Sequence, residues 1–429
     1  MKKKLFILFI TALFVSLNNA FATPPSTNGN FNVVIEGYDW GPAVSKVILQ
    51  MENPVNSVNW NDYAIRVHRS SDCSTIPSNQ VLGSRNVIAG YVSDAEGNRL
   101  TEGNYATLVL AVAPNQPIHS PIQYSNAEGC RGNHWINYDI TIWDETKGLV
   151  WDQEVNRIMP IIDRFDLSGR FSDENGISMS YAFYTPKNDQ VKSPLIVWLH
   201  GGGEGGVDPS IPLVANKAAN YASDEIQDIF DGAYVLVPQS PTRWMDSGEG
   251  STSGQVDDIY FSAVKELIEN FIAKHPNADR NRIYVGGASN GGYLALKLII
   301  EYPDLFAAAF PSAIAFGGDY FSVEQAERIK NIPIWFIHSK YDRTTAPDRT
   351  VIPIYQRLMD AGASNVHFSY FDYVVDITGF FGGEGYHYPD HWSWIYSHAN
   401  TARRDYDNSL VKLDGRPVSI MEWMARQSK

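Results

Sequence analysis

The segment that most constrains this chain runs from Arg282 to Glu301 and reads RIYVGGASNGGYLALKLIIE. A short apolar run leads into a serine flanked by glycines and then into apolar residues at helical spacing. Glycines two residues before and two residues after Ser289 let a strand and a helix pack closely at a sharp turn that exposes the serine hydroxyl. A GxSxG pattern is common by chance, but the strand before it and the helix after it make Ser289 the candidate nucleophile.

Further apolar runs alternate with helical patterns on both sides of this turn. Alternating strands and helices predict a mostly parallel sheet covered by helices, the α/β class. Ligands of such sheets bind beyond the carboxyl ends of the strands, so residues that directly follow strands are the candidates for chemistry. The expected strands span residues 194–199, 233–237, 283–287, 332–338 and 366–371, and helical spacing covers residues 256–274 and 291–301.

A glycine-rich turn, His200 to Gly206, follows the strand at residues 194–199. A backbone N–H of such a turn can approach a substrate oxygen, and the N–H of Asn290 supplies a second donor, which together predict an oxyanion hole. The turn lacks the lysine of a phosphate-binding GxxxxGK[ST] loop. A merely flexible glycine loop remains the alternative.

An acid is expected just after a late strand, and Asp342 lies in the turn that follows residues 332–338. Asp348 and Asp372 compete with it. Asp348 follows Pro347, where the next helix is expected to begin, and a carboxylate there is explained by the helix dipole. Asp342 is therefore the preferred candidate.

A general base is needed to accept the serine proton, and histidine changes protonation near neutral pH. Three histidines lie near the C-terminal end of the glycine-rich loop 379–390: His387, His391 and His398. We select His391, which opens the motif HWSW at the end of this loop, and the order Ser289, Asp342, His391 is that of α/β-hydrolases.

The N-terminus has the pattern of an export signal. Lys2 to Lys4 precede an apolar run from Leu5 to Val15, and Ala20-Phe21-Ala22 provides small residues at a cleavage site. The sequence predicts a signal peptide at residues 1–22 and a secreted protein, periplasmic or extracellular. The alternative, an uncleaved anchor, needs roughly 18 to 20 apolar residues, and this run is shorter.

The first third of the chain has a different texture from the rest. Short strand-like runs separated by Asn, Gly, Pro and Ser predict an antiparallel, immunoglobulin-like β-sandwich. We expect this domain at residues 23–160 and an α/β-hydrolase domain at residues 161–429. The expected strands are residues 32–37, 45–50, 63–68, 106–113 and 135–143.

Cys73 and Cys130 are the only cysteines of the chain. In an exported protein such a pair predicts a disulfide, with two free thiols as the alternative. Neither cysteine stands in a metal-binding spacing, so no metal site is expected. The formal net charge of −14 is spread without long charged runs, which argues against nucleic-acid and anionic-membrane partners.

Taken together, the motifs PLIVWLHGGGEGG, VPQSP with the nearby Trp244, RIYVGGASNGGY, IHSKYD and HWSW resemble those of secreted bacterial esterases with an N-terminal immunoglobulin-like domain. These esterases are grouped with predicted peptidases and polyhydroxybutyrate-depolymerase-like proteins. The resemblance covers nearly all of the mature chain, although the N-terminal part matches only in texture.

The resemblance implies a Ser289, Asp342 and His391 triad, with the backbone of Gly202 and Asn290 as the oxyanion hole. It implies hydrolysis of small or polymeric esters through an acyl-enzyme, with no cofactor. Four aromatic residues are candidates for apolar walls of the substrate site, with ordinary packing as the alternative for each: Trp244, Tyr341, Trp392 and Trp394.

Two other functions are compatible with these residues. A peptidase of the prolyl-oligopeptidase type would use the same triad, but such enzymes commonly carry a propeller, and the chain has no propeller repeats. The non-enzymatic alternative is a surface protein whose sandwich binds polysaccharide beside a relic hydrolase domain. Relics usually lose part of their catalytic set, and here every part is present.

Overall fold

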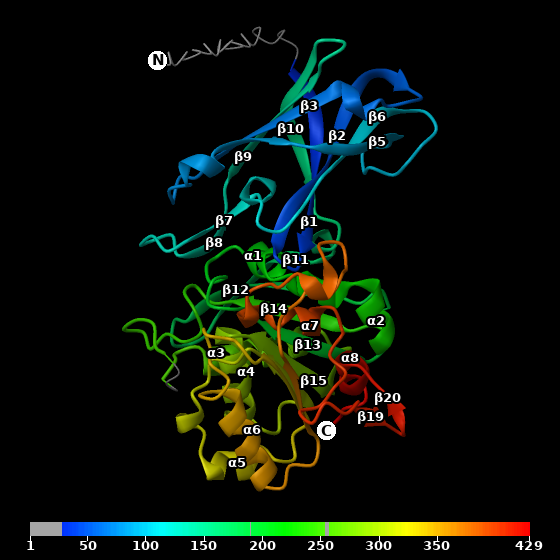
Figure 1. Cartoon of the computed structure of the whole chain (residues 1–429). Helices are drawn as coiled ribbons and strands as arrows, with labels where there is room; N and C mark the ends of the chain where they lie inside the picture. The colour runs from blue at the N-terminus through cyan, green and yellow to red at the C-terminus, as the bar shows by residue number, and fades with distance from the viewer. Residues whose placement is uncertain (1–27, 189, 254–256) are drawn as a thin grey trace, which may run out of the picture.

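The computed structural model describes residues 28–188, 190–253 and 257–429. The predicted signal peptide, residues 1–22, lies outside the described residues. The chain forms two layered units, one above the other in Figure 1, each built on an eight-stranded sheet.

The first sheet has the order β4-β3-β9-β10-β1-β2-β6-β5. Strands β1 and β10 are parallel, and every other neighbouring pair in this sheet is antiparallel. Its strands hydrogen-bond into one continuous sheet. Side chains from β1, β2, β3, β6, β9 and β10 form one apolar core. The bounds are β1 Asn28–Tyr38, β2 Gly41–Val55, β3 Tyr63–Ser70, β4 Leu82–Arg85, β5 Val87–Ser93, β6 Gly103–Leu110, β9 Asn137–Asp144 and β10 Leu149–Ile158.

Alternation of apolar and polar residues explains why these segments form strands with one buried face. In β3, Ile65 and Val67 are buried while the intervening Arg66 is exposed. A separate hairpin, β7 (Ile122–Ser125) and β8 (Gly132–Trp135), extends toward the second unit (Figure 1).

The second sheet has the order β11-β12-β14-β13-β15-β16-β17-β18. Six neighbouring strands, β14, β13, β15, β16, β17 and β18, run parallel. Strands β11 and β12 add an antiparallel edge. All residues of β13, β14, β16 and β17 are buried, as predicted for strands covered on both faces. The bounds are β11 Asp166–Ser172, β12 Ser178–Tyr184, β13 Ser193–Leu199, β14 Tyr234–Gln239, β15 Ala278–Ala288, β16 Ala308–Ser312, β17 Ile334–Ser339 and β18 Val366–Phe371.

Helices cover both faces of this sheet, and each face has its own apolar core. Side chains of α3 to α6 contribute to one core, and those of α1, α2, α7 and α8 to the other. No helix of the described segments has the length and apolarity required to cross a bilayer. The bounds are α1 Ser210–Ala215, α2 Asp224–Phe230, α3 Phe261–Lys274, α4 Asn290–Glu301, α5 Val323–Ile329, α6 Val351–Asp360, α7 Ile395–His398 and α8 Ile420–Met424; a small ladder joins β19 Lys412–Leu413 to β20 Arg416–Pro417.

Polar contacts join the two units. The Lys217 Nζ lies 3.1 Å from the Oδ1 of the buried Asp39, and the indole N–H of Trp135 donates to the Ser210 hydroxyl at 2.9 Å. The first sheet ends at Ile158 and the second begins at Asp166. The precise domain boundary near residue 160 stays a prediction.

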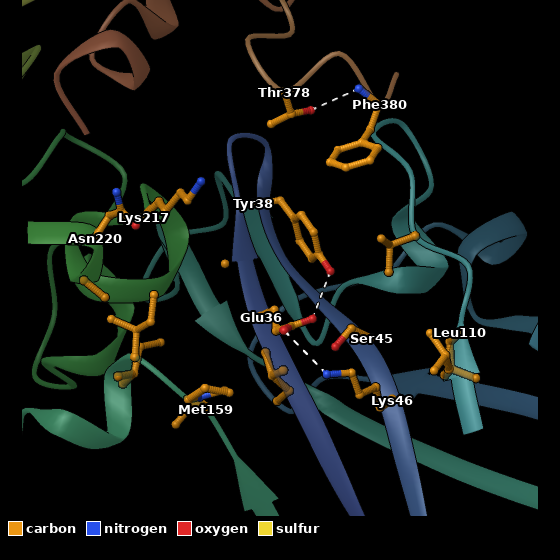
Figure 2. A pocket seen from close by; sticks show the side chains of 18 of the residues that line it. Glu36, Tyr38, Ser45, Lys46, Leu110, Met159, Lys217, Asn220, Thr378 and Phe380 are labelled. Carbon is orange, nitrogen blue, oxygen red and sulfur yellow. Dashed lines mark hydrogen bonds and ion pairs between the residues drawn. The ribbon is translucent and has the colours of Figure 1, made fainter. Parts of the chain in front are cut away.

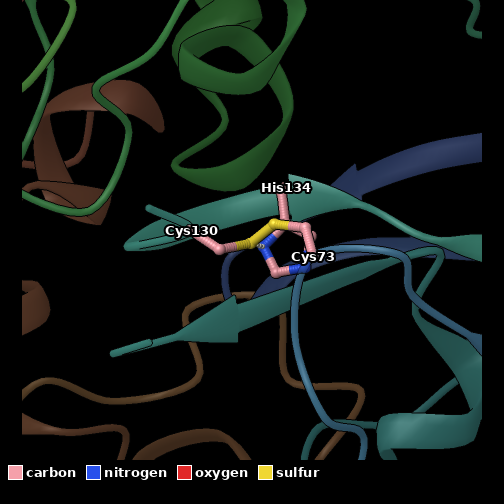
Figure 3. A group of neighbouring side chains, drawn as sticks. All are labelled: Cys73, Cys130 and His134. Carbon is pink, nitrogen blue, oxygen red and sulfur yellow. Dashed lines mark hydrogen bonds between the residues drawn. A yellow bond between two sulfur atoms is a disulfide. The ribbon is translucent and has the colours of Figure 1, made fainter. Parts of the chain in front are cut away.

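The disulfide between Cys73 and Cys130 is present, with the two Cα atoms 5.7 Å apart (Figure 3). His134 lies beside it: its Nδ1 is 3.8 Å from the Cys130 sulfur, and its Nε2 is 3.0 Å from the Ser74 hydroxyl. Metal binding by this group would need thiolates, and both sulfurs are consumed by the disulfide.

Reduction of this disulfide should lower the melting temperature of the first domain. The bond joins cysteines 57 positions apart. A loop of that length is worth about 4 kcal/mol in the chain-entropy description, which corresponds to a shift on the order of 10 °C. Differential scanning calorimetry with and without reductant measures the shift. The double variant Cys73→Ser, Cys130→Ser is the control and should melt identically in both buffers, whereas a wild-type transition insensitive to reductant would contradict the prediction.

Candidate active site

Ser289 stands at the turn between β15 and α4, as predicted from the glycine spacing. Its backbone adopts φ 55° and ψ −107°, and L-residues rarely adopt a positive φ. A side chain at Gly287 or Gly291 would collide with backbone atoms, Gly291 against the carbonyl oxygen of Leu199. The sequence thus forces a strained turn that presents the serine at the carboxyl edge of the sheet.

Asp342 and His391 are brought together from different strand ends. The His391 Nδ1 lies 2.8 Å from the Asp342 Oδ2, although 49 residues separate them. His391 belongs to a 3₁₀ turn, Asp390–Trp392, in the segment after β18, and Asp342 follows β17. A hydrogen bond from Nδ1 to the carboxylate fixes the ring orientation and leaves Nε2 as the nitrogen that can accept a proton.

The Asp342 carboxylate is buried and fully hydrogen-bonded. The backbone N–H groups of Thr344 and Thr345 donate to Oδ1 at 2.8 and 3.1 Å, and the Thr345 hydroxyl donates to Oδ2 at 2.8 Å. Burial acts to raise the pKa of Asp342, but hydrogen bonds from His338 and His391 outweigh it and hold that pKa well below its usual range. Asp342 therefore stays ionised.

His338 is a second histidine on the same carboxylate, which sequence reasoning left inside a strand. Its Nε2 lies 3.2 Å from the Asp342 Oδ2 and 2.8 Å from the carbonyl oxygen of Thr345, and the residue is fully buried. Both neighbours are acceptors, so Nε2 carries a proton. The four-residue spacing of His338 and Asp342 at a strand end was the available signal.

His200 is the first residue of the glycine turn, and its buried ring holds the turn through two hydrogen bonds. The ring is fully buried, with Nδ1 2.6 Å from the Gly201 carbonyl oxygen and Nε2 accepting the Ser240 N–H at 3.2 Å. Burial lowers the pKa of His200 to about 4, despite the opposing hydrogen bond to Gly201. A neutral His200 thus holds the turn in which Gly202 lies.

Asn290 begins α4, directly after Ser289. Its backbone N–H has no partner within the helix, because the first N–H groups of a helix have no carbonyl one turn before them. Its side chain is used elsewhere: the Oδ1 accepts the Met245 N–H at 3.1 Å. The backbone N–H of Asn290 is therefore available beside the serine.

The four predicted aromatic wall residues differ in accessibility. Trp244 is fully buried, and its indole donates to the His200 carbonyl oxygen at 3.0 Å, which favours the packing alternative. Trp394 is also buried and presents its ring edge-on to His391 at 5.4 Å. Tyr341 is 46% exposed, and Trp392 is partly buried. Tyr341 and Trp392 are thus the accessible candidates.

Two hollows adjoin the predicted catalytic and oxyanion-hole residues, and a third does not. A cavity of about 660 Å³ is lined by Gly202, and a shallow hollow of about 460 Å³ is lined by His391 and Tyr341. The third, about 680 Å³, lies where the two units meet, with Tyr38 and Phe380 on its wall (Figure 2). None of the predicted catalytic residues lines this third cavity.

The first domain contacts the glycine turn directly, which sequence reasoning missed. The Asn133 N–H donates to the Gly203 carbonyl oxygen at 2.6 Å, and its side-chain amide donates to the Glu204 Oε1 at 2.9 Å. Burial raises the pKa of Glu204 to about 7, although hydrogen bonds from Asn133 and Asn216 act to lower it. No sequence pattern links residues so far apart.

The loop that carries His391 also rests on the first domain. The Asn115 side-chain amide donates to the Tyr386 hydroxyl at 2.6 Å, and Trp40 packs edge-on against Phe381 with ring centroids 4.7 Å apart. These contacts define the path of the loop 379–390 before it reaches His391.

His398 gives a prediction for the pH dependence of stability. The ring is 1% exposed and neither nitrogen has a hydrogen-bond partner among the described residues. Burial, followed by the charge of Lys217, lowers its pKa to about 3. The unfolded pKa is about 6.5, so between these values the unfolded state binds a proton that the folded state does not. Stability should fall as the pH drops from 6.5 toward 3, with His200 acting in the same direction.

The variant His398→Leu should show a flatter acid limb and an equal or higher melting temperature at pH 7.5. Replacing a buried, unsatisfied ring by an apolar side chain removes a desolvation cost. Thermal melts at several pH values from 7.5 to 5 measure both effects. Ser84→Ala, which removes no titratable group from the exposed face of β4, is the control and should keep the wild-type slope. A slope in His398→Leu as steep as in wild type would refute this origin.

Two families match the chain. Residues 30–154 match the esterase Ig-like N-terminal domain, and residues 242–350 match the prolyl oligopeptidase family. The second match includes Ser289 and Asp342 and ends before His391.

Curated relatives match in part. The chain is 28% identical over 145 residues to poly(3-hydroxyalkanoate) depolymerase C of Paucimonas lemoignei, covering 32% of this chain and 31% of that protein. It is 27% identical over 149 residues to feruloyl esterase B of Thermothelomyces thermophilus, covering 34% of this chain and 47% of that protein. The chain thus spans less than half the length of either relative.

Among solved structures, a thermostable esterase is similar along nearly the whole chain. The superposition has a TM-score of 0.73 at 24% sequence identity and covers 93% of this chain and 99% of that one. The likeness extends over both units and shows a shared fold. The chain therefore has an α/β-hydrolase fold preceded by an immunoglobulin-like domain, and that first domain is similar to the esterase Ig-like N-terminal domain.

Proposed function

We propose that the chain is a serine carboxylesterase that uses Ser289, His391 and Asp342. The observation that carries the proposal is the 2.8 Å contact between His391 Nδ1 and Asp342 Oδ2 at the same sheet edge as the strained turn at Ser289. The match of the first domain to an esterase-associated family and the esterase relatives favour an ester substrate, small or polymeric.

The reaction follows from the positions of these groups. His391 Nε2 accepts the Ser289 proton while the serine oxygen attacks the ester carbonyl carbon. The N–H groups of Gly202 and Asn290 stabilise the oxyanion that forms, which is worth several kcal/mol. His391 then protonates the departing alcohol, and water hydrolyses the acyl-enzyme by the same steps. Ionised Asp342 stabilises the imidazolium formed in each step.

Peptide hydrolysis is the second candidate. The match to the prolyl oligopeptidase family over residues 242–350 supports it, because that stretch contains Ser289 and Asp342. The immunoglobulin-like first domain stands where a propeller would be expected in such a peptidase. Esters are therefore the preferred substrates.

Export remains part of the proposal. It rests on the residues preceding Thr23, which fit a cleavable signal, and the disulfide between Cys73 and Cys130 suits an oxidising compartment. Sequencing the N-terminus of the protein recovered from the periplasm or the medium tests the cleavage site after Ala22.

One experiment separates enzyme, peptidase and relic. The purified protein is labelled with a fluorophosphonate probe and assayed with para-nitrophenyl esters of graded chain length beside aminoacyl para-nitroanilides. Labelling at Ser289 together with ester turnover is the expected result. Faster turnover of the anilides would favour the peptidase, and the absence of both labelling and turnover would favour the relic.

A further inference from the structure

Two arginines line the cleft beside Gly202, and neither forms an ion pair with a carboxylate in the described parts of the chain. Arg243 and Arg131 both line the cavity of about 660 Å³ that Gly202 also lines. The Arg243 Nε is buried and has no hydrogen-bond partner among the described residues. Arg243 as a whole is partly exposed and Arg131 is exposed, so their remaining guanidinium N–H donors can reach a ligand in the cleft.

The two residues that follow Arg243 hold its backbone in place. The Trp244 indole donates to the His200 carbonyl oxygen at 3.0 Å, and the Met245 N–H donates to the Asn290 Oδ1 at 3.1 Å. These bonds tie the segment after β14 to both halves of the predicted oxyanion hole. The guanidinium consequently covers Gly202, where an added Cβ would lie only 3.1 Å from Arg243 Nη2.

Arg131 comes from the first domain and is anchored on both sides. Cys130, the residue before it, is bonded to Cys73 (Figure 3). Gly132, the residue after it, has φ 102° and packs so closely on the Gly203 carbonyl oxygen that a side chain would collide. The disulfide and this contact fix the hairpin that brings Arg131 to the cleft.

The two arginines line this cavity together with Asp208 and Asp246, but among the described residues no ion pair joins either arginine to these carboxylates. Burial first, and then the charge of Arg131, lower the pKa of Arg243. Asp246 is the nearby carboxylate whose charge opposes this, and its oxygens are oriented by the Thr242 hydroxyl at 2.7 Å on Oδ2 and a backbone N–H at 2.9 Å on Oδ1. Glu204 is buried with a pKa raised to about 7, so it contributes only a partial negative charge.

We propose that Arg243 and Arg131 bind a carboxylate group of the substrate, so that the preferred esters are acidic. The inference rests on the proposed esterase function and names its substrate class. Planar guanidinium groups bind carboxylates through paired, charge-assisted hydrogen bonds, which suits the empty donors beside Gly202. With a net charge of −14 the protein as a whole repels anions, so a local pair of cations is needed to retain one.

The test uses two pairs of esters that differ in one charge. On the acyl side, para-nitrophenyl valerate is compared with the para-nitrophenyl monoester of glutaric acid. On the alcohol side, para-methylphenyl acetate is compared with the acetate ester of para-hydroxybenzoate. In at least one pair, kcat/KM of the wild type should favour the acidic ester by roughly 10- to 100-fold, after correction for the rates with hydroxide.

Variants assign that preference to the arginines. Arg243→Gln should reduce the acidic-to-neutral ratio about tenfold or more, Arg243→Lys should restore part of it, and Arg131→Gln should reduce it by a smaller factor. Arg280→Gln is the control for net charge and should leave the ratio unchanged, because Arg280 is exposed at the start of β15, the opposite end of the strand from Ser289.

The outcomes that overturn the inference differ from those that overturn the esterase proposal. Equal loss on both members of each pair in Arg243→Gln, or a wild-type preference for the neutral ester in both pairs, would remove the carboxylate subsite and leave the esterase intact. Failure of the wild type to hydrolyse any of the four esters would instead overturn the esterase proposal itself.

Discussion

Ser289→Ala should lose ester hydrolysis by roughly four to six orders of magnitude in kcat. Only one hydroxyl is removed, but without it no acyl-enzyme forms, and the remaining groups can only orient water. The alanine fits the same turn, because the flanking glycines, not the serine, relieve the collisions with Leu199. Steady-state turnover of a para-nitrophenyl ester measures the loss.

The control for Ser289→Ala is Ser84→Ala, an exposed serine of β4 in the first domain, which should retain wild-type turnover. Circular dichroism and the melting temperature should match the wild type in both variants. Near-wild-type turnover in Ser289→Ala would exclude Ser289 as the nucleophile and with it the proposed mechanism.

His391→Ala should remove nearly as much activity as Ser289→Ala, and the double variant should be little worse than either. The two residues act as one unit, so losing the base leaves a hydroxyl that is a poor nucleophile near neutral pH. The measurement is kcat for the three proteins over one substrate series. Additive losses in the double variant would show that His391 and Ser289 act independently.

His387→Ala and His398→Leu are the matched controls for the base and should keep substantial turnover. His387 is exposed and stacks on Tyr373 with ring centroids 4.4 Å apart, so its loss changes the rim of the loop. His398 is enclosed between Trp198 and Tyr221. An inactive His398→Leu beside an active His391→Ala would reverse the assignment of the base.

The order of strands and helices in the second domain was predictable because buried parallel strands leave continuous apolar runs. The strand Ile334–Ser339 lies within two residues of its predicted bounds. The helix after His391 spans only Ile395–His398 and was not predicted. Short helices carry too few turns for periodicity to mark their ends.

Contacts between segments far apart in the chain could not be predicted from the sequence. The pairing of Asp342 with His391 followed from a known chain order, but the approach of His338 to the same carboxylate depends on how the turn after β17 folds back. The burial of Trp244 likewise depends on how the loop after β14 packs against His200. Such features arise from tertiary packing, for which a single sequence holds no local pattern.

The loop that carries His391 contacts Trp40 and Asn115 of the first domain. The glycine turn contacts Asn133 of the same domain. The first domain therefore supports both loops that the proposed mechanism uses. In a chimaera that joins the second domain to a foreign first domain, these contacts of Trp40, Asn115 and Asn133 would be lost.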